Sequence, residues 1–198
     1  MSTPPRQAAV ILGTRASALA RVQTDLVIGL LTSAWPDLAC QTRVIGTAGD
    51  RTQATGEPLP EIGGKGLFTE DLERALRDGE IDLAVHSLKD LPTEDAAGVV
   101  VDTALDRECA LDDPASRAET TAERTFLRAL GAGCAAPVAA LATATTTPRV
   151  RLQGLVAAVD GGLMVRVQGE GEPEELGEGL AQDAIAAGAD RILAAIRG

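Results

Sequence analysis

The chain has few aromatic side chains and little positive charge, and both shortages argue against one large class of function. Aromatic residues make up 2% of the 198 residues, with two Phe, one Trp and no Tyr. Because 18 Lys and Arg stand against 29 Asp and Glu, the net charge is −11, which repels phosphate. Without stacking side chains or a basic surface, the composition argues against nucleic-acid binding.

Long apolar runs and clustered metal ligands are also missing. No run approaches the ~18 apolar residues of a membrane span, and the polar, Pro-containing residues 1–7 do not resemble a signal peptide. Cys40, Cys109 and Cys134 are odd in number and widely spaced, so we expect neither a disulfide framework nor a zinc site. His86 is the only histidine. These absences favour a cytoplasmic protein without a bound metal.

What the chain does contain is enough apolar mass, 45% of its residues, to form one or two cores. Strand and helix patterns that alternate over residues 8–104 predict an α/β domain with a parallel or mixed sheet and helices on its faces. After residue 113 the pattern changes to a helix, three strands and two helices, which predicts an α+β domain with an antiparallel sheet. We therefore expect two domains, residues 1–113 and 114–198.

The expected elements follow from apolar spacing, capping residues and turn residues. Ser17 is the expected N-cap of the first helix, and Gly79 is the expected stop of the second. In the first helix an apolar set shares near-helical spacing: Leu19, Val22, Leu26 and Leu30. Strands are expected at 8–12, 40–45, 81–85, 98–104, 136–143, 149–159 and 163–168, and helices at 17–31, 67–78, 115–130, 172–187 and 191–196.

Polar side chains follow two of the predicted strands directly. Residues 81–85 end at His86, Ser87, Lys89 and Asp90, a set that suits an anionic ligand needing one acid or base partner. Arg15 and Ser17 lie between a strand and a helix start, where backbone N–H groups attract a carboxylate. Spacing alone also allows simpler interpretations: a surface Arg15 with an ordinary N-cap serine, a hydrogen-bonded structural His86, and a solvated pair of Lys89 and Asp90.

Two loops of small residues carry further candidates. The loop at 63–66 is not a phosphate-binding P-loop, because Gly66 stands where Ser or Thr must follow Lys65. Lys65 is instead a candidate basic residue near the ligand crevice expected at the carboxyl ends of the strands. Cys134 lies in the loop at 131–137, whose small neighbours leave a thiol accessible to modification. The alternative is a small buried hydrophobe, which also suits Cys40 and Cys109.

Four motifs, in one order along the chain, carry a resemblance to a known family. They are GTRASALA at 13–20, GGKGLFT at 63–69, VHSLKDLP at 85–92 and GAGCAAPV at 131–138. Together they make the chain resemble the porphobilinogen deaminases, also called hydroxymethylbilane synthases. The first two motifs are weak alone, whereas the last two together are specific, and the resemblance covers nearly the whole chain.

The resemblance implies a transferase of tetrapyrrole, porphyrin and heme biosynthesis. Such enzymes join porphobilinogen units head to tail, with loss of ammonia, into hydroxymethylbilane. They build it on a dipyrromethane cofactor held by a thioether, for which Cys134 matches the attachment residue. Asp90 matches the catalytic carboxylate, which hydrogen-bonds pyrrole N–H and stabilises the cation left by ammonia. Five residues match positions that bind acetate and propionate groups of cofactor or substrate: Arg15, Ser17, Lys65, Ser87 and Lys89.

The chain also departs from the family, which has three domains, the first two resembling lobes of a type II periplasmic binding protein. Residues 102–108 resemble the end of a strand leading into the second domain, and residues 109–113 resemble the returning segment. About one domain is then missing between these two segments. In the family the active-site cleft lies between the first two domains, so most arginines that line the far wall of that cleft are missing as well. Residues 99–105 would have to replace a returning strand, and Glu61 stands where several relatives carry a basic residue.

Three hypotheses follow from this departure. The first is a porphobilinogen deaminase of reduced length that is less stable and much less active than a full-length relative. The second is a non-catalytic or vestigial pyrrole-binding protein. The third is a chain whose cleft is completed by another chain. The resemblance implies a monomer, the third hypothesis implies self-association, and none involves nucleic acid or a membrane.

Overall fold

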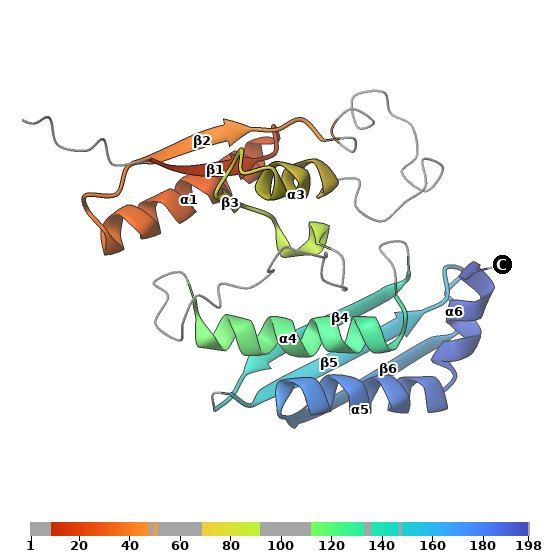
Figure 1. Ribbon diagram of the computed structural model, residues 1–198. Coiled ribbons are helices and arrows are strands. Elements are labelled where there is room, and N and C mark those ends of the chain that lie inside the picture. The colour runs from red at the N-terminus through yellow and green to blue at the C-terminus, as the bar shows by residue number, and fades with distance from the viewer. Residues whose placement is uncertain are drawn as a thin grey trace, which may run out of the picture. The chain divides into compact units, whose positions relative to one another are not determined.

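The computed structural model describes residues 9–47, 50, 69–91, 112–132, 136–146 and 148–197. The chain divides into two compact units, residues 1–112 and 113–198, which run from red to green and from green to blue in Figure 1. Parallel and antiparallel sheets occur together with helices, so the predicted mixture of α/β and α+β structure is found. Within the described ranges no helix combines the length and the apolar character that a membrane span requires.

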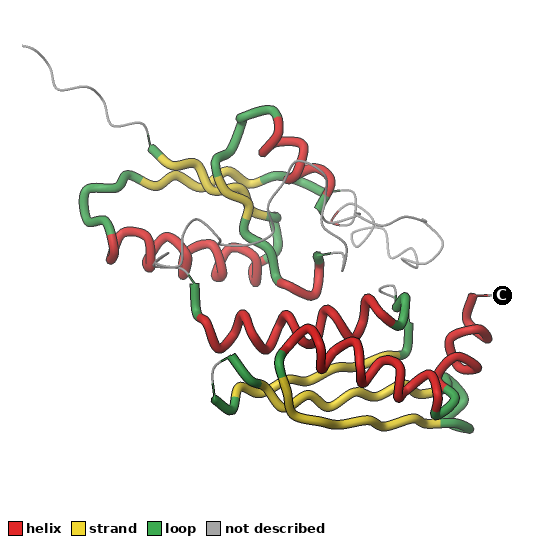
Figure 2. Tube along the Cα trace, turned by 60° about the horizontal axis from the view of Figure 1, so that its bottom comes forward, coloured by secondary structure: helices red, strands yellow, loops and turns green. Residues whose placement is uncertain are grey.

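The first unit is built on three parallel strands in the order β2-β1-β3. β1 (Val10–Thr14) is central, with β2 (Cys40–Val44) and β3 (Leu83–Ala84) beside it. Helices α1 (Ala18–Ala34) and α3 (Glu70–Arg77) cover opposite faces of this sheet, which can be followed in both Figure 1 and Figure 2. The predicted strand at 98–104 lies outside the described residues.

Local signals explain where these elements begin and end. Ser17 caps α1 as predicted, because its side chain accepts a hydrogen bond from the Ala20 backbone N–H at 3.3 Å. Gly79 follows α3 with a φ of 69°, the left-handed conformation that glycine adopts at little cost. β1 runs two residues further than expected, so Thr14 belongs to the sheet rather than to a turn. β3 is shorter than the predicted strand. Asp50, which lies between the strand predicted at 40–45 and the helix predicted at 67–78, is helical.

The apolar spacing in α1 was read correctly, but that face of the helix does not pack on the sheet. Ala20, Thr24 and Leu31 are the buried residues of α1. They lie on a different side of the helix from the predicted set, because at about 100° per residue the two groups are centred roughly 135° apart. Small residues at 20 and 24 let the helix approach the sheet closely. The exposed set is 52–64% accessible and comprises Leu19, Val22, Leu26 and Leu30.

The second unit is an antiparallel sheet, as predicted, in the order β4-β5-β6, and its helices lie on one face (Figure 2). Its first helix begins at Asp113, whose side chain accepts from the Ser116 backbone N–H at 2.7 Å, with Pro114 in the first turn. The elements in order are α4 (Pro114–Ala129), β4 (Val138–Ala144), β5 (Val150–Ala157), β6 (Met164–Gly171), α5 (Pro173–Ala186) and α6 (Ala189–Arg197).

The core of the second unit is tight enough to require glycine at two places. Phe126 of α4 is fully buried, and a Cβ on Gly154 of β5 would lie 2.4 Å from its ring. Gly177 of α5 sits against α4, where a Cβ would lie 2.8 Å from the Ala122 carbonyl oxygen. Alternation along β5 buries Val150, Leu152 and Val156 beneath the helices. The position of this unit's helices is therefore fixed by close contact.

Candidate functional site

The candidate site lies at the carboxyl ends of β1 and β3 in the first unit. α1 leaves β1 on one face of the sheet, and α3 arrives at β3 from the other face (Figure 1). Open α/β sheets bind ligands outside the carboxyl ends of their strands. Arg15 and Ser17 follow β1, while His86 to Asp90 follow β3, so two of the four motifs meet at this edge.

Arg15 is the centre of the site. Its side chain is 9% exposed and its Nη1 donates to Asp90 Oδ2 at 2.8 Å. Its Nε and Nη2 donate to Asp50 Oδ1 at 3.1 and 2.6 Å. The interpretation of Arg15 as a surface side chain is therefore wrong. Asp90 is 18% exposed and paired with Arg15. A buried cation and two carboxylates are brought together from sequence positions 15, 50 and 90.

Asp50 was not identified from the sequence, although its local signal is present. Thr47 and Asp50 bond each other in the manner of a capping box: the Asp50 N–H donates to Thr47 Oγ1 at 3.2 Å, and the Thr47 N–H donates back to Asp50 Oδ2 at 3.2 Å. The Thr47 hydroxyl also donates to Oδ2, at 2.7 Å. Burial raises the pKa of Asp50, but hydrogen bonds from Arg15 and Thr47 outweigh it and hold the pKa below its usual value. Asp50 is therefore anionic at neutral pH.

The two predicted serines have different surroundings. Ser17 is an N-cap, in keeping with the simpler of its two interpretations. The Ser87 hydroxyl donates to Gln23 Oε1 of α1 at 2.6 Å, which links the segment after β3 to the helix after β1. Gln23 was also missed, because a glutamine inside a helix carries no signal of its own. The link places an amide and a hydroxyl, two neutral polar groups, beside the charged ones.

His86 has a buried ring nitrogen, Nδ1, without a hydrogen-bond partner among the described residues. Its interpretation as a hydrogen-bonded structural group is therefore not supported at that atom. Burial lowers the pKa of His86. The negative charges of Asp90 and Glu73 oppose this shift, whereas the positive charge of Arg15 adds to it. The imidazole is therefore neutral at pH 7 and responds to the charges of the site.

Other predicted site residues cannot be placed. Lys65, Cys109, Cys134 and the side chain of Lys89 lie outside the described residues, as does Glu61. The predicted attachment of the cofactor to Cys134 therefore stays a prediction. Cys40 is a free thiol that is half-buried, rather than the buried hydrophobe that was one interpretation. Among the described residues, no group of three or more His, Cys, Asp or Glu could hold a metal ion.

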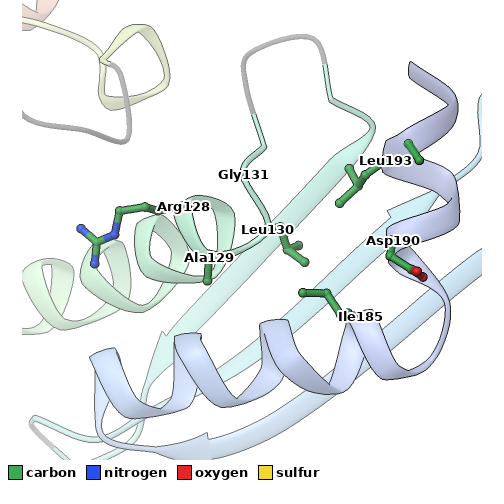
Figure 3. A pocket seen from close by; sticks show the side chains of 8 residues that line it. Arg128, Ala129, Leu130, Gly131, Ile185, Asp190 and Leu193 are labelled. Atoms are coloured by element: carbon green, nitrogen blue, oxygen red, sulfur yellow. The ribbon is translucent and has the colours of Figure 1, made fainter. Parts of the chain in front are cut away.

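A hollow lies in the second unit, where the end of α4 meets α5 and α6 (Figure 3). Its volume is about 620 Å³, and Leu130, Ile185 and Leu193 provide apolar walls. Arg128 and Asp190 are on its rim, and the Arg128 side chain points away from the apolar walls (Figure 3). The hollow therefore has no converging polar groups, unlike the edge of β1 and β3.

Comparisons with known proteins agree on one family. A family model described as the porphobilinogen deaminase, dipyromethane cofactor binding domain matches residues 10–155. The porphobilinogen deaminase of Moorella thermoacetica is 30% identical over 303 positions, which cover 94% of this chain and 96% of that protein. Those of Rickettsia typhi and Syntrophomonas wolfei are 47% and 48% identical over 97 residues, or 49% of this chain.

The extent of these matches differs. The two shorter ones span 32% and 31% of the relatives' own lengths, so they compare about a third of each relative. The match to the Moorella protein occupies 303 positions, which exceed the 198 residues of this chain by 105. At least 105 positions of that alignment therefore hold no residue of this chain. Because the match runs through 96% of the relative, these positions are gaps inside the alignment.

Proposed function

The chain belongs to the porphobilinogen deaminase family, and on that basis we propose that it joins porphobilinogen units head to tail into hydroxymethylbilane, with release of ammonia. The proposal makes it a transferase of tetrapyrrole biosynthesis that works on a dipyrromethane primer. The observation that carries it is the pairing of Arg15 with Asp90 at 2.8 Å, at an edge of the sheet built from two family motifs. This edge offers a cation for carboxylates and an anion for pyrrole N–H groups.

The donor set fits the cofactor. Dipyrromethane carries acetate and propionate groups, and a guanidinium binds carboxylates through charge-assisted hydrogen bonds. Arg15 supplies such a group at one edge of the sheet, together with the neutral hydroxyl of Ser87 and the neutral amide of Gln23. In the proposal they hold the cofactor with Ser17, Lys65 and Lys89, and Cys134 attaches it as a thioether. When bound, the cofactor supplies the pyrrole carbon that is extended.

Asp90 has the central chemical role in the proposal. Its carboxylate accepts hydrogen bonds from pyrrole N–H and stabilises the cation that forms when ammonia leaves porphobilinogen. Arg15 holds Asp90 through Oδ2 and so limits how that carboxylate can turn. A fixed anion stabilises a developing cation better than a mobile one, because no reorganisation is needed during the reaction.

We further propose that the reaction is slower than in full-length relatives. The 105 or more positions without a counterpart correspond in size to one domain. In the proposal this is the domain whose arginines form the far wall of the cleft. Loss of several Arg–carboxylate contacts, at roughly 1.5–3 kcal/mol each, weakens binding by orders of magnitude. A poorly shielded site also stabilises charge less well.

The first experiment is an intact-mass measurement after incubation with porphobilinogen. The proposal expects a ladder of masses in the wild type, absent in Cys134→Ser. Cys40→Ser is the matched control, because Cys40 is a free, half-buried thiol outside the proposed site. A ladder that persists in Cys134→Ser contradicts the attachment residue. An unmodified wild-type mass contradicts the enzymatic proposal.

The missing positions also favour a second candidate, a pyrrole-binding protein without turnover. It predicts reversible binding of porphobilinogen or linear tetrapyrroles with no mass ladder. In that case Asp90→Asn leaves binding largely intact and removes no activity, whereas in the enzyme it abolishes turnover. A cleft completed by a second chain is distinguished by light scattering, which then reports an oligomer.

A further inference from the structure

Asp50 is bonded on two sides, and this gives it a role that neither the motifs nor the relatives assign. One oxygen, Oδ2, accepts from the backbone and the hydroxyl of Thr47, and the other, Oδ1, accepts from two nitrogens of Arg15. We propose that Asp50 is a positioning residue, which holds the Arg15 guanidinium at the angle from which Nη1 reaches Asp90.

The Thr47 contacts fix the carboxylate itself. Thr47 has no exposed surface, and its N–H and hydroxyl lie 3.2 and 2.7 Å from Oδ2. The N–H of Asp50 donates in return to the Thr47 hydroxyl. A carboxylate held through one oxygen, on a backbone held by a reciprocal bond, has little freedom to rotate. Oδ1 therefore points in a defined direction.

The orientation of Asp50 determines the orientation of the Arg15 guanidinium, and so the position of the nitrogen that binds Asp90. Because the group is planar and rigid, contacts to Nε and Nη2 determine where Nη1 lies. In this chain the Nε–Nη2 edge faces Asp50 and Nη1 donates to Asp90. Without Asp50 the guanidinium loses two hydrogen bonds and can move away from Asp90. Asp50 thereby keeps Arg15 and Asp90 in a contact through one nitrogen and one oxygen.

The consequence for the reaction rests on the proposed function, in which Asp90 is catalytic and Arg15 binds carboxylates. If Arg15 moves, the carboxylate of the ligand that it binds moves with it, and so does the Asp90 carboxylate that faces the reacting atoms. Shifts of this kind lower turnover even when the chemical groups are all present. The geometric part of the inference does not depend on the reaction and can be tested separately.

His86 provides a readout that needs no activity. It is the only histidine among 198 residues, so a single imidazole is observed in NMR titration. Asp90, Glu73 and Arg15 all act on it, and among them Arg15 lowers its pKa. Arg15→Gln gives the shift expected when the cation is absent. If Asp50 positions Arg15, then Asp50→Asn raises the pKa of His86 toward the value in Arg15→Gln.

The matched control is Asp82→Asn, which removes one carboxylate from the same unit. Asp82 Oδ2 accepts from the Ile11 N–H at 2.7 Å, at the opposite end of the sheet from the site. We expect Asp82→Asn to leave the His86 titration unchanged. Asp50→Glu, which keeps the charge, should restore a titration close to that of the wild type. A His86 pKa that stays the same or falls in Asp50→Asn overturns the inference and leaves Asp50 as a helix-capping residue.

Kinetics complete the test. We expect Asp50→Asn to lower turnover by about tenfold to 100-fold, with partial rescue in Asp50→Glu and no loss in Asp82→Asn. Turnover equal to wild type in Asp50→Asn overturns the inference. If the wild type itself shows no turnover, the proposed function fails, and the His86 titration still decides the role of Asp50.

Discussion

At the scale of single residues, the site depends on one buried guanidinium shared between two acids. Arg15 is 9% exposed, and its partners Asp50 and Asp90 are 16% and 18% exposed. Such a group is held by geometry as well as by charge, because burial removes the water that would otherwise solvate it. A lysine has the same charge but lacks the fork that serves both acids.

We therefore expect Arg15→Lys to lower the free energy of unfolding by about 1–2 kcal/mol, since one set of hydrogen bonds is lost. Arg15→Met should lower it by about 3 kcal/mol, because two carboxylates then lose their cation. Urea unfolding measures both. Arg43→Lys is the control: its pair with Glu80 is about half exposed, so the change should stay within about 0.5 kcal/mol. Equal stability of Arg15→Met and wild type would contradict the buried network.

The sequence predicted only the part of this network that lies next to strand ends. Arg15 and Asp90 follow apolar strands, and position alone marked them as candidates. Asp50 and Gln23 were missed, because each acts through a partner 35 or 64 residues away. A pattern such as Thr47 to Asp50 identifies a helix start, but it does not tell which side chain the second carboxylate oxygen binds.

At the scale of elements, the same limit applies to α1. The period of its apolar residues predicted a helix, and a helix is present. The side that packs was not predictable, because small residues such as Ala20 and Thr24 are as useful at a close contact as large ones. In the second unit, the predicted strand at 149–159 contains β5, and burial alternates along it in the structure. Alternation identifies a face, whereas a helix with apolar residues on two sides does not.

The crossing of α4 and α5 depends on Gly177. A Cβ there would lie 2.8 Å from a backbone oxygen of α4, which cannot move without shifting the helix. We expect Gly177→Ala to destabilise the chain by about 1–3 kcal/mol. Gly179→Ala is the matched control, because a Cβ there meets nothing within 4 Å. It should stabilise the chain by about 0.5–1 kcal/mol through helix propensity. Thermal unfolding measures both variants. If Gly177→Ala is as stable as Gly179→Ala or more stable, the result contradicts this packing.

The edge of β4 is covered by two acids of α4. Glu119 and Glu123 accept from the backbone N–H groups of Ala144 and Ala142, each at 2.8 Å. Burial raises the pKa of Glu123 above its ordinary value of 4.5, and Glu119 adds to this. The folded state therefore retains that proton to a higher pH than the unfolded chain. The contribution of Glu123 to stability falls as the pH rises above about 4.5.

We expect Glu123→Gln to be more stable than the wild type at pH 7, because the neutral amide oxygen still accepts from Ala142. The gain should stay below about 1 kcal/mol, since the carboxyl is only partly buried. Near pH 4 the gain should vanish, because the wild-type carboxyl is then protonated in both states. Urea unfolding at the two pH values provides the measurement. A variant that is less stable at pH 7 would show that the charge itself stabilises the edge.

At the scale of the whole molecule, the described residues of the two units contribute unequally to the buried core. Of the buried apolar side chains among the described residues, fifteen belong to the second unit and six to the first. We expect two thermal transitions, with the first unit unfolding at the lower temperature. Arg15→Met should move the lower transition and Gly177→Ala the upper one. A single transition that both variants move would mean that the units unfold together.

The proposed loss of a domain is also a property of the whole molecule. At −11, the chain repels anionic pyrroles at a distance, so binding depends on the few cations at its site. A cleft with one wall leaves part of the ligand's carboxylates in water. We therefore expect kcat/KM more than tenfold below that of the Moorella relative, since one lost Arg contact alone accounts for about 1.5 kcal/mol. Light scattering on the same sample distinguishes the explanations: an active oligomer indicates that a second chain supplies the missing wall. A monomer with turnover equal to the relative would mean that one wall is sufficient.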